Sequence, residues 1–253
     1  TKHLEFAEGR PGTTDLTRHE LALGDDVVIG PGERPLTIPK PVRHDGLVCG
    51  PLGGFAGFPF RSGIRCRADF DGATLVRTNT GPLFEDYELE YAFADHRTYR
   101  ISFRCYHDEP LVEVAERYGL RLGAELVWTI NPARRFTHIL SRESFEKENQ
   151  PQIEPLIKDR PRDLLCRLQM PVLSEYFIPN NRGWFAFFND DNHDQPMLGV
   201  LGLYGDRWQQ PVEGMKELYG RDGAVAWQAS LESGARYWLL YTGPLETRHR
   251  PDR

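Results

Sequence analysis

Residues 87–118 read YELEYAFADHRTYRISFRCYHDEPLVEVAERY, and apolar side chains occupy every second position in three successive segments of this stretch. Strict alternation of this kind predicts β-strands with one face in a hydrophobic core. The alternation is interrupted at Ala94–Thr98 and at His107–Pro110, and both interruptions have lengths that suit hairpin loops. The stretch therefore predicts a three-stranded antiparallel meander.

These loops also predict which residues face one another across the strands. The inner layers would be Tyr87, Cys105 and Val112, followed by Leu89, Phe103 and Val114. The outer row would be Glu88, Arg104 and Glu113, in which an arginine lies between two carboxylates. Opposite charges are favourable in directly facing positions, and a slip by one residue would move charges into the core.

The composition is that of a chain with one large core. The chain has 253 residues, including ten Tyr, fourteen Phe and five Trp, which suits sheets packed face to face. A net charge of −6 without a basic stripe argues against a nucleic-acid partner. No uninterrupted apolar run approaches the roughly 20 residues that a membrane span requires.

Four cysteines, at positions 49, 66, 105 and 166, are too few and too scattered for a disulfide framework or a zinc site. Cys66, Cys105 and Cys166 are in step with apolar neighbours, which predicts small core residues. The chain begins with Thr1 and has no signal-like apolar segment, so we expect a removed leader or a domain of a longer protein. Localisation is therefore open, with a secreted or periplasmic location favoured.

The rest of the chain predicts more strands and little helix. Residues 1–60 are rich in Pro and Gly and predict an irregular arm and a loop, Gly50–Phe60, packed on the body of the protein, with Asp26–Ile29 as a candidate short strand. Asp71-Gly72 predicts a hairpin turn after a strand at Ile64–Phe70, and Ser141 is a candidate cap of a short helix. Further strands are predicted at Glu125–Ile130, 164–170, Trp184–Phe188, Met197–Tyr204, 225–231 and Arg236–Thr242, and a helical turn at Pro211–Tyr219. Residues 1–253 thus predict a single all-β domain, a large antiparallel sandwich of two sheets.

Arg104, Tyr106 and His107 form the first candidate catalytic group. An arginine can neutralise a carboxylate, and a tyrosine or histidine can move a proton, which are the tasks of β-elimination from a uronic acid. The alternative is structural: Arg104 pairs with neighbouring carboxylates, and His107 opens an exposed turn. Glu116 falls opposite Ile101 on the apolar side, where it would be a buried acid unless a β-bulge near Ala115 turns it outward; we favour the bulge.

A second group would bind ligand rather than react. Trp184, Tyr204 and Trp208 are candidates for stacking on sugar rings, with Arg207 and His193 as polar contacts. Residues 190–194 alternate as Asp, Asn and Asp, like the opening of a calcium loop, but Gln195 replaces the glycine of the sharp turn. A solvated hairpin tip explains the same residues, so we expect no cofactor and no metal, with Ca²⁺ as the alternative.

Several segments resemble one known family. They are Gly81-Pro82-Leu83-Phe84, the motif from Tyr106 to Val114, Trp184–Phe188 and Gly234–Trp238. Together they resemble the galactose-mutarotase-like supersandwich of polysaccharide lyases and glycoside hydrolases. The resemblance implies a module that binds oligo- or polysaccharide or supports a neighbouring catalytic domain in a polysaccharide-degrading protein. The alternatives are a self-sufficient lyase acting on uronic-acid glycans and a non-enzymatic structural or protein-interaction sandwich.

Overall fold

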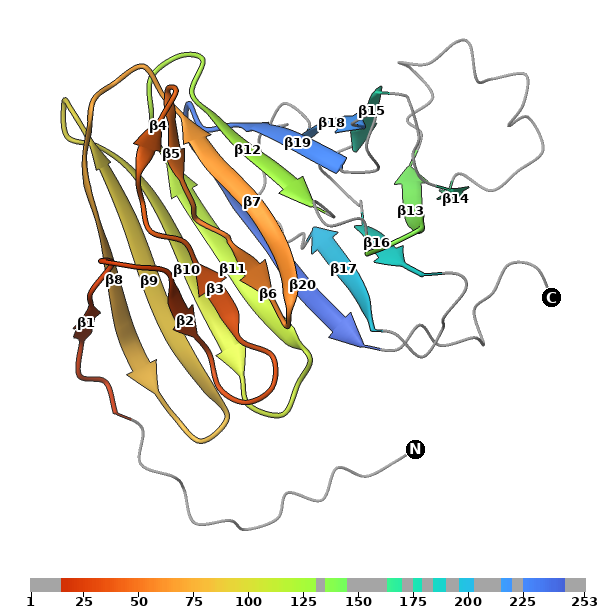
Figure 1. Cartoon of the computed structure of the whole chain (residues 1–253), viewed down its shortest axis with the longest axis horizontal. Helices are drawn as coiled ribbons and strands as arrows, with labels where there is room; N and C mark the ends of the chain where they lie inside the picture. The colour runs from red at the N-terminus through yellow and green to blue at the C-terminus, as the bar shows by residue number, and fades with distance from the viewer. Residues whose placement is uncertain are drawn as a thin grey trace.

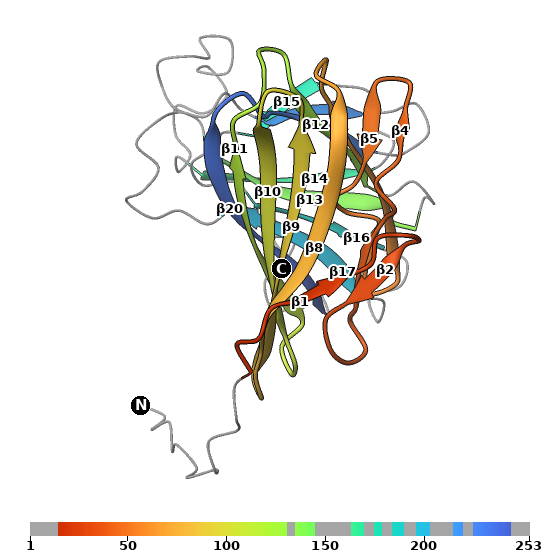
Figure 2. The ribbon, with the colours of Figure 1, turned by 90° about the vertical axis from the view of Figure 1, so that its left-hand side faces the viewer.

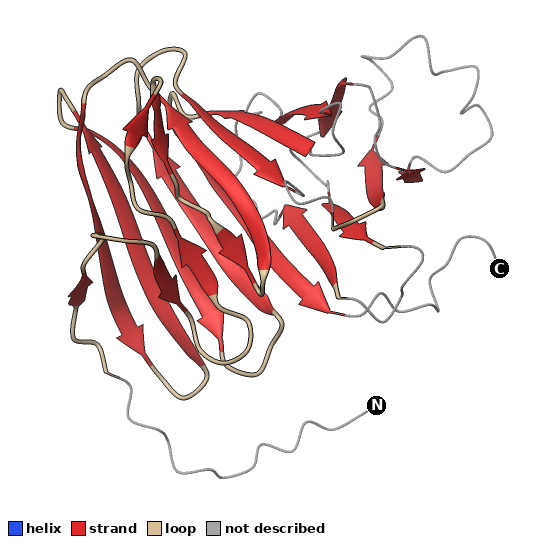
Figure 3. Ribbon diagram, in the orientation of Figure 1, coloured by secondary structure: helices blue, strands red, loops and turns tan. Residues whose placement is uncertain are grey.

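The computed structural model describes residues 15–130, 135–144, 163–169, 175–178, 184–189, 196–202, 215–219 and 225–243. Side chains are described throughout the first of these ranges and at 135–138, 186–189, 196–200 and 229–243. The described residues form strands and connecting loops, and they contain no helix (Figure 3). In particular, they include no helix long and apolar enough to cross a membrane.

The first sheet has ten strands, and every pairing in it is antiparallel. In spatial order its strands are β1 (His19–Leu21), β8 (Phe70–Thr80), β9 (Phe84–Phe93), β10 (Arg97–Tyr106), β11 (Leu111–Tyr118), β20 (Gly234–Gly243), β17 (Met197–Gly202), β16 (Trp184–Phe188), β13 (His138–Ser144) and β14 (Asp163–Gln169). The predicted meander is the centre of this sheet. Its long strands lie side by side in Figure 2.

The second sheet is also antiparallel and packs on the first. Its strands are β15 (Glu175–Ile178), β18 (Met215–Tyr219), β19 (Val225–Ser230), β12 (Glu125–Ile130), β7 (Phe58–Arg65), β6 (Gly54–Phe55), β3 (Leu36–Ile38) and β2 (Val27–Ile29); in addition, β5 (Leu47–Cys49) pairs with β7, and β4 (Arg43–His44) pairs with β5. Figure 1 shows β7 and β12 in front of the long strands of the first sheet. The predicted all-β sandwich of two antiparallel sheets is confirmed.

The core lies between the two sheets. Trp128 of β12 meets Trp238 of β20 with 5.1 Å between ring centroids. The hydroxyl of Tyr91 on β9 donates to the carbonyl oxygen of Cys49 on β5 at 3.3 Å. Leu89 and Ile101 are fully buried, and burial of such a side chain stabilises the fold by about 1.5–3 kcal/mol.

The predicted loop between β10 and β11 is correct, and so is the register it implies, with Cys105 facing Val112 and Phe103 facing Val114. The register of β9 on β10 differs by two residues, because Tyr87 faces Phe103 and not Cys105. The loop between β9 and β10 is shorter than predicted, since β9 continues to Phe93 and β10 begins at Arg97.

The short loop depends on two residues with left-handed backbone, Asp95 at φ 67° and His96 at φ 56°. Asp is one of the residues that adopt this conformation most readily, and it allows the chain to reverse in few residues. A slip by two keeps every side chain on its predicted face. The alternation was therefore unable to reveal it.

Two predicted turns or loops are strands or parts of strands. Within Gly50–Phe60, β6 and β7 form a hairpin around Ala56 and Gly57, both with positive φ. Asp71-Gly72 does not end a hairpin but lies inside β8, where the register on β9 shifts between Phe70 and Gly72. Gly72 accommodates this register shift, and glycine inside a strand often marks such a bulge.

Other differences come from pairing partners that are distant in sequence. The segment that begins at Ser141 is not a helix, because His138–Ser144 pairs with both β14 and β16. Met215–Tyr219 is the strand β18 rather than a helical turn. Within residues 19–55, which were otherwise expected to be irregular, the candidate strand at Asp26–Ile29 is confirmed as β2, and five further short strands were not predicted.

Candidate functional site

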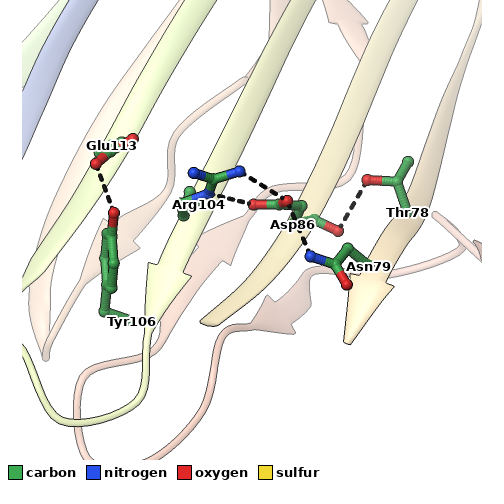
Figure 4. Close-up of polar contacts among 6 residues, drawn as sticks. All are labelled: Thr78, Asn79, Asp86, Arg104, Tyr106 and Glu113. Carbon is green, nitrogen blue, oxygen red and sulfur yellow. Dashed lines mark hydrogen bonds and ion pairs between the residues drawn. The ribbon is translucent and has the colours of Figure 1, made fainter. Parts of the chain in front are cut away.

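The face of the first sheet that points away from the core carries two of the predicted catalytic residues, Arg104 and Tyr106. We call it the outer face. Arg104 and Tyr106 lie on it in β10, with Asp86 of β9 and Glu113 of β11 as neighbours (Figure 4). Residues at alternate positions share a face, so each side chain is placed by the period-two pattern of its own strand.

Arg104 is fixed by a two-pronged ion pair. Its Nε donates to Asp86 Oδ1 at 2.8 Å, and its Nη2 donates to Asp86 Oδ2 at 3.1 Å. Asp86 also accepts a hydrogen bond from Asn79 Nδ2 at 3.2 Å. The guanidinium lies over the ring of Phe84, with 4.2 Å from Cζ to the ring centroid.

The predicted partner of Arg104 was Glu88, and this part of the prediction is wrong. Because β9 is shifted by two residues, Glu88 faces Ser102, and Arg104 faces Asp86. Its other predicted neighbour, Glu113, does face it across β11. The hydrogen bonds to Asp86 raise the pKa of Arg104 above its ordinary value, so the guanidinium remains charged.

Tyr106 is held at the edge of this cluster. Its hydroxyl donates to Glu113 Oε1 at 2.6 Å, and its ring makes an edge contact with Phe84. Partial burial, and then the hydrogen bond to Glu113, raise the pKa of the Tyr106 phenol above its ordinary value of 10.0. Tyr106 is therefore a neutral hydrogen-bond donor near neutral pH, which is the opposite of an activated base.

His107 does not join Arg104 and Tyr106. It is half-buried at the turn after β10, where its backbone N–H donates to the carbonyl of Leu83 at 3.0 Å. Its Nε2 is enclosed without a hydrogen-bond partner among the described residues. The expected exposed turn residue is thus a partly enclosed imidazole, and it does not line the hollow on the outer face.

An open hollow of about 340 Å³ lies next to Arg104 on the outer face. We call it the outer groove. The side chains that line it include Thr78, Asp86, Glu88, Arg104, Glu113 and Tyr237. Glu88 is partly screened by Arg18, whose Nη2 lies 3.3 Å from Glu88 Oε2. The groove presents carboxylates, a guanidinium and a tyrosine that are all at least partly exposed.

Sequence reasoning missed Asp86, Glu88 and Tyr237 as groove residues. Asp86 and Glu88 continue the alternation of β9 towards its start, and Tyr237 has the matching position in β20. Of these three residues, the alternation had placed only Glu88 on the outer face. It was unable to show that β20 is the neighbour of β11, because more than a hundred residues separate these strands.

The other predicted ligand-binding residues are not tested. Trp184 begins β16, and its side chain is outside the described part of the structure. His193, Tyr204, Arg207 and Trp208 lie outside the described residues, as do Asp190, Asn192 and Asp194 of the calcium-like loop. Within the described residues, no three His, Cys, Asp or Glu side chains lie close enough together to hold a metal ion.

Glu116 is buried on the core side of β11 and is only 1% exposed. The β-bulge that we favoured from the sequence is absent, because Glu116 pairs regularly with Ile101 on β10 and with Arg236 on β20. Its carboxylate accepts hydrogen bonds from Arg236 Nε at 2.7 Å and Nη2 at 3.1 Å. The Tyr99 hydroxyl donates to it at 2.6 Å, and Trp238 Nε1 donates at 3.0 Å. We call these four residues the buried cluster.

The buried cluster joins three neighbouring strands, since Tyr99 is on β10, Glu116 on β11, and Arg236 and Trp238 on β20. Burial, then the charge of Glu116, raise the pKa of Tyr99 well above 10.0. The guanidinium of Arg236 also lies 4.7 Å from the ring centroid of Tyr118. These residues face the core, so they do not contribute to the outer groove.

No protein-family model matches the sequence. A search of curated proteins likewise finds no match. Among solved structures, a GH36 α-galactosidase from Geobacillus stearothermophilus in complex with raffinose is similar, with 10% identity over 87% of this chain and a TM-score of 0.47. A β-arabinopyranosidase has 12% identity over 87% of this chain and a TM-score of 0.49.

A lysyl oxidase from Pichia pastoris has 7% identity over 90% of the chain and a TM-score of 0.35. The chain spans 41%, 40% and 41% of the lengths of these three structures. Glycoside hydrolases are thus among the structural neighbours, together with an oxidase. Similarity at this level assigns no activity to the chain, so the function has to be argued from the outer face itself.

Proposed function

We propose that this chain is a carbohydrate-binding supersandwich module of the galactose-mutarotase-like type, and that sugar binds in the outer groove. The module would belong to a larger polysaccharide-degrading protein and act beside a catalytic domain. The observation that carries the proposal is the outer groove, in which Asp86, Arg104 and Glu113 are already held in place by contacts with one another and with Tyr106.

The chemistry of the groove suits sugar hydroxyls. A hydroxyl both donates and accepts, so a ligand with many hydroxyls needs acceptors such as Glu88 and Glu113 next to a donor such as Arg104. Tyr237 adds an aromatic ring to the lining. The volume of about 340 Å³ lies within the ordinary range of small-ligand sites, about 300–1,000 Å³. Side chains that are fixed before binding lose little entropy when the ligand arrives.

Binding is better supported than elimination by Arg104, Tyr106 and His107. The Tyr106 hydroxyl donates a hydrogen bond to Glu113, and the pKa of Tyr106 is raised rather than lowered. His107 does not line the groove. Tyr106 is neutral and already hydrogen-bonded, and His107 is partly enclosed outside the groove. The two residues therefore do not form a proton-transfer pair at one position. The groove has the features of a recognition surface.

Titration calorimetry with a panel of neutral and uronic-acid oligosaccharides tests the proposal. Arg104→Ala should weaken binding by about tenfold or more, because a charged hydrogen bond to the sugar contributes about 1.5–3 kcal/mol. Arg65→Ala is the matched control, since Arg65 makes a comparable cross-strand pair with Glu125 on the other sheet, at 2.9 Å.

Thermal melting of both variants should show that each remains folded, because exposed ion pairs contribute only about 0–1 kcal/mol. The proposal fails if no oligosaccharide releases heat on mixing. It also fails if Arg104→Ala and Arg65→Ala bind equally well, since the sugar site would then lie away from the groove.

A further inference from the structure

A second hollow, of about 480 Å³, lies on the same sheet where β10 begins and β11 ends. Its lining includes Asp95, Arg97, Arg100, Arg117, Tyr118 and Ala235. We call it the arginine pocket. Three arginines in one hollow are notable in a chain with a net charge of −6, because local and overall charge have opposite signs.

Two of these arginines face each other directly. Arg100 on β10 is the cross-strand partner of Arg117 on β11. Like charges in directly facing positions destabilise a sheet, so this arrangement needs a compensating anion. Glu90 supplies one for Arg100, with which it forms an ion pair.

Arg117 has no such partner. It is exposed, and it makes no ion pair or side-chain hydrogen bond within the described part of the chain. Its neighbour on the other side is Ala235 of β20, which has no charge. Its guanidinium therefore remains available to a ligand, with five donors in a planar arrangement that matches an oxyanion.

The rim of the pocket does not neutralise this charge. Asp95 forms an ion pair with Arg121, so its carboxylate is already used. Arg97 donates from Nη1 to the carbonyl oxygen of Leu120 at 2.9 Å, which fixes its position but leaves its charge. Arg97 and Arg117 are thus two positive charges without a paired carboxylate among the described residues.

The arginine pocket and the outer groove are neighbours along the same strands. On β10, Thr98 and Arg100 line the pocket, and Ser102 and Arg104 line the groove. Arg100 and Arg104 are four residues apart, which is about 13 Å at about 3.3 Å per residue. A ligand of several sugar units lying along β10 would reach both hollows.

From these observations we infer that the glycan is acidic and that the arginine pocket binds its oxyanion, either the carboxylate of a uronic acid or a sulfate ester. The inference rests on the proposed function, since it specifies the ligand class of the same face. An arginine pair recognises either group through paired N–H donors. The attraction would add to affinity and would weaken as salt is raised.

The test compares Arg117→Gln with the unaltered chain in titration calorimetry. The ligands are a galacturonate oligosaccharide, a sulfated galactose oligosaccharide and a neutral galactose oligosaccharide of the same length. We expect the variant to bind the preferred acidic ligand about tenfold more weakly, to show a smaller dependence on salt, and to bind the neutral ligand unchanged. Whichever acidic ligand shows this loss identifies the oxyanion.

Arg61→Gln is the matched control, because Arg61 is also an exposed strand arginine without an ion pair among the described residues, but it lies on β7 of the other sheet and does not line the pocket. This control should bind all three ligands as the unaltered chain does. Neutral and acidic ligands that bind equally well, or acidic binding that survives Arg117→Gln, would overturn the inference and leave the proposed function in place. Absence of binding by these three ligands and by every oligosaccharide of the wider panel would refute both.

Discussion

Replacing Glu116 with alanine should destabilise the fold more than removal of any exposed charge on the same sheet. The substitution deletes the acceptor of four hydrogen bonds, two from Arg236, one from Tyr99 and one from Trp238. It also leaves the guanidinium of Arg236 in the core without a counter-ion, where its side chain is only 10% exposed.

The expected loss in the free energy of unfolding is about 3–5 kcal/mol, the usual result when one partner of a buried ion pair is removed. The four hydrogen bonds do not add separately, because Tyr99 and Trp238 would relax or admit water. For a chain of this size, about 2–4 °C of melting temperature corresponds to each kcal/mol, so the melting temperature should fall by about 6–20 °C.

Urea unfolding followed by tryptophan fluorescence measures this change, with Glu125→Ala as the comparison. Glu125 belongs to an exposed pair with Arg65, so its loss should cost at most about 1 kcal/mol. A second pair of variants separates charge from packing. Glu116→Leu leaves Arg236 unpaired, whereas Glu116→Leu combined with Arg236→Met removes both charges.

The double variant should be more stable than Glu116→Leu, although it has lost more polar contacts, because burial of an unpaired charge is the dominant cost. If Glu116→Ala cost less than about 1 kcal/mol, or if the double variant were the less stable of the two, the reasoning would be refuted. The buried cluster would then contribute through its packing alone.

Two further predictions concern the backbone and pH. Ala56→Gly should stabilise the β6–β7 turn by about 0.5–1 kcal/mol, and Gly57→Ala should destabilise it, because both positions have positive φ (48° and 79°). Melting temperatures of the two variants that shift in the same direction would contradict this prediction. Stability should fall as pH rises above about 9, because burial raises the pKa of Cys105 to about 12 and that of Tyr99 well above 10.0. The unfolded chain then loses protons first, so stability that is complete at lower pH declines by about 1.4 kcal/mol per pH unit for each such group; urea midpoints that stay constant from pH 8 to 11 would exclude the effect.

The faces of the central strands were predictable from sequence, but their partners were only partly so. Alternation placed Phe103 and Leu89 in the core and Arg104 outside, as the structure confirms. It was insensitive to the two-residue shift of β9, which depends on the left-handed backbone at Asp95 and His96. β3 has only three residues, too few for a clear period, and the seven residues of β13 do not alternate; both strands form because other strands pair with them.

In the candidate site, too, the face of each residue was more predictable from sequence than its partners. The β10–β11 loop was predicted correctly, and with it Arg104 and Glu113 came together as expected. Glu116 was misjudged because a lone carboxylate in an apolar row usually signals a bulge, and its real partner, Arg236, is 120 residues away in sequence. A sequence pattern gives the face of a residue, but it does not give the neighbour that makes a buried charge acceptable.

The buried cluster and the outer face are linked by the same alternation that defines the fold. Tyr99 lies between Thr98 and Arg100, and Glu116 lies between Ala115 and Arg117, so each buried anchor is flanked in its strand by residues that line the two hollows. Four hydrogen bonds to one carboxylate fix the spacing and register of β10, β11 and β20 from the core side. The buried cluster thus holds Arg100 and Arg117 opposite each other despite their repulsion. A positive pocket that is formed before the ligand arrives binds an oxyanion with a small loss of entropy.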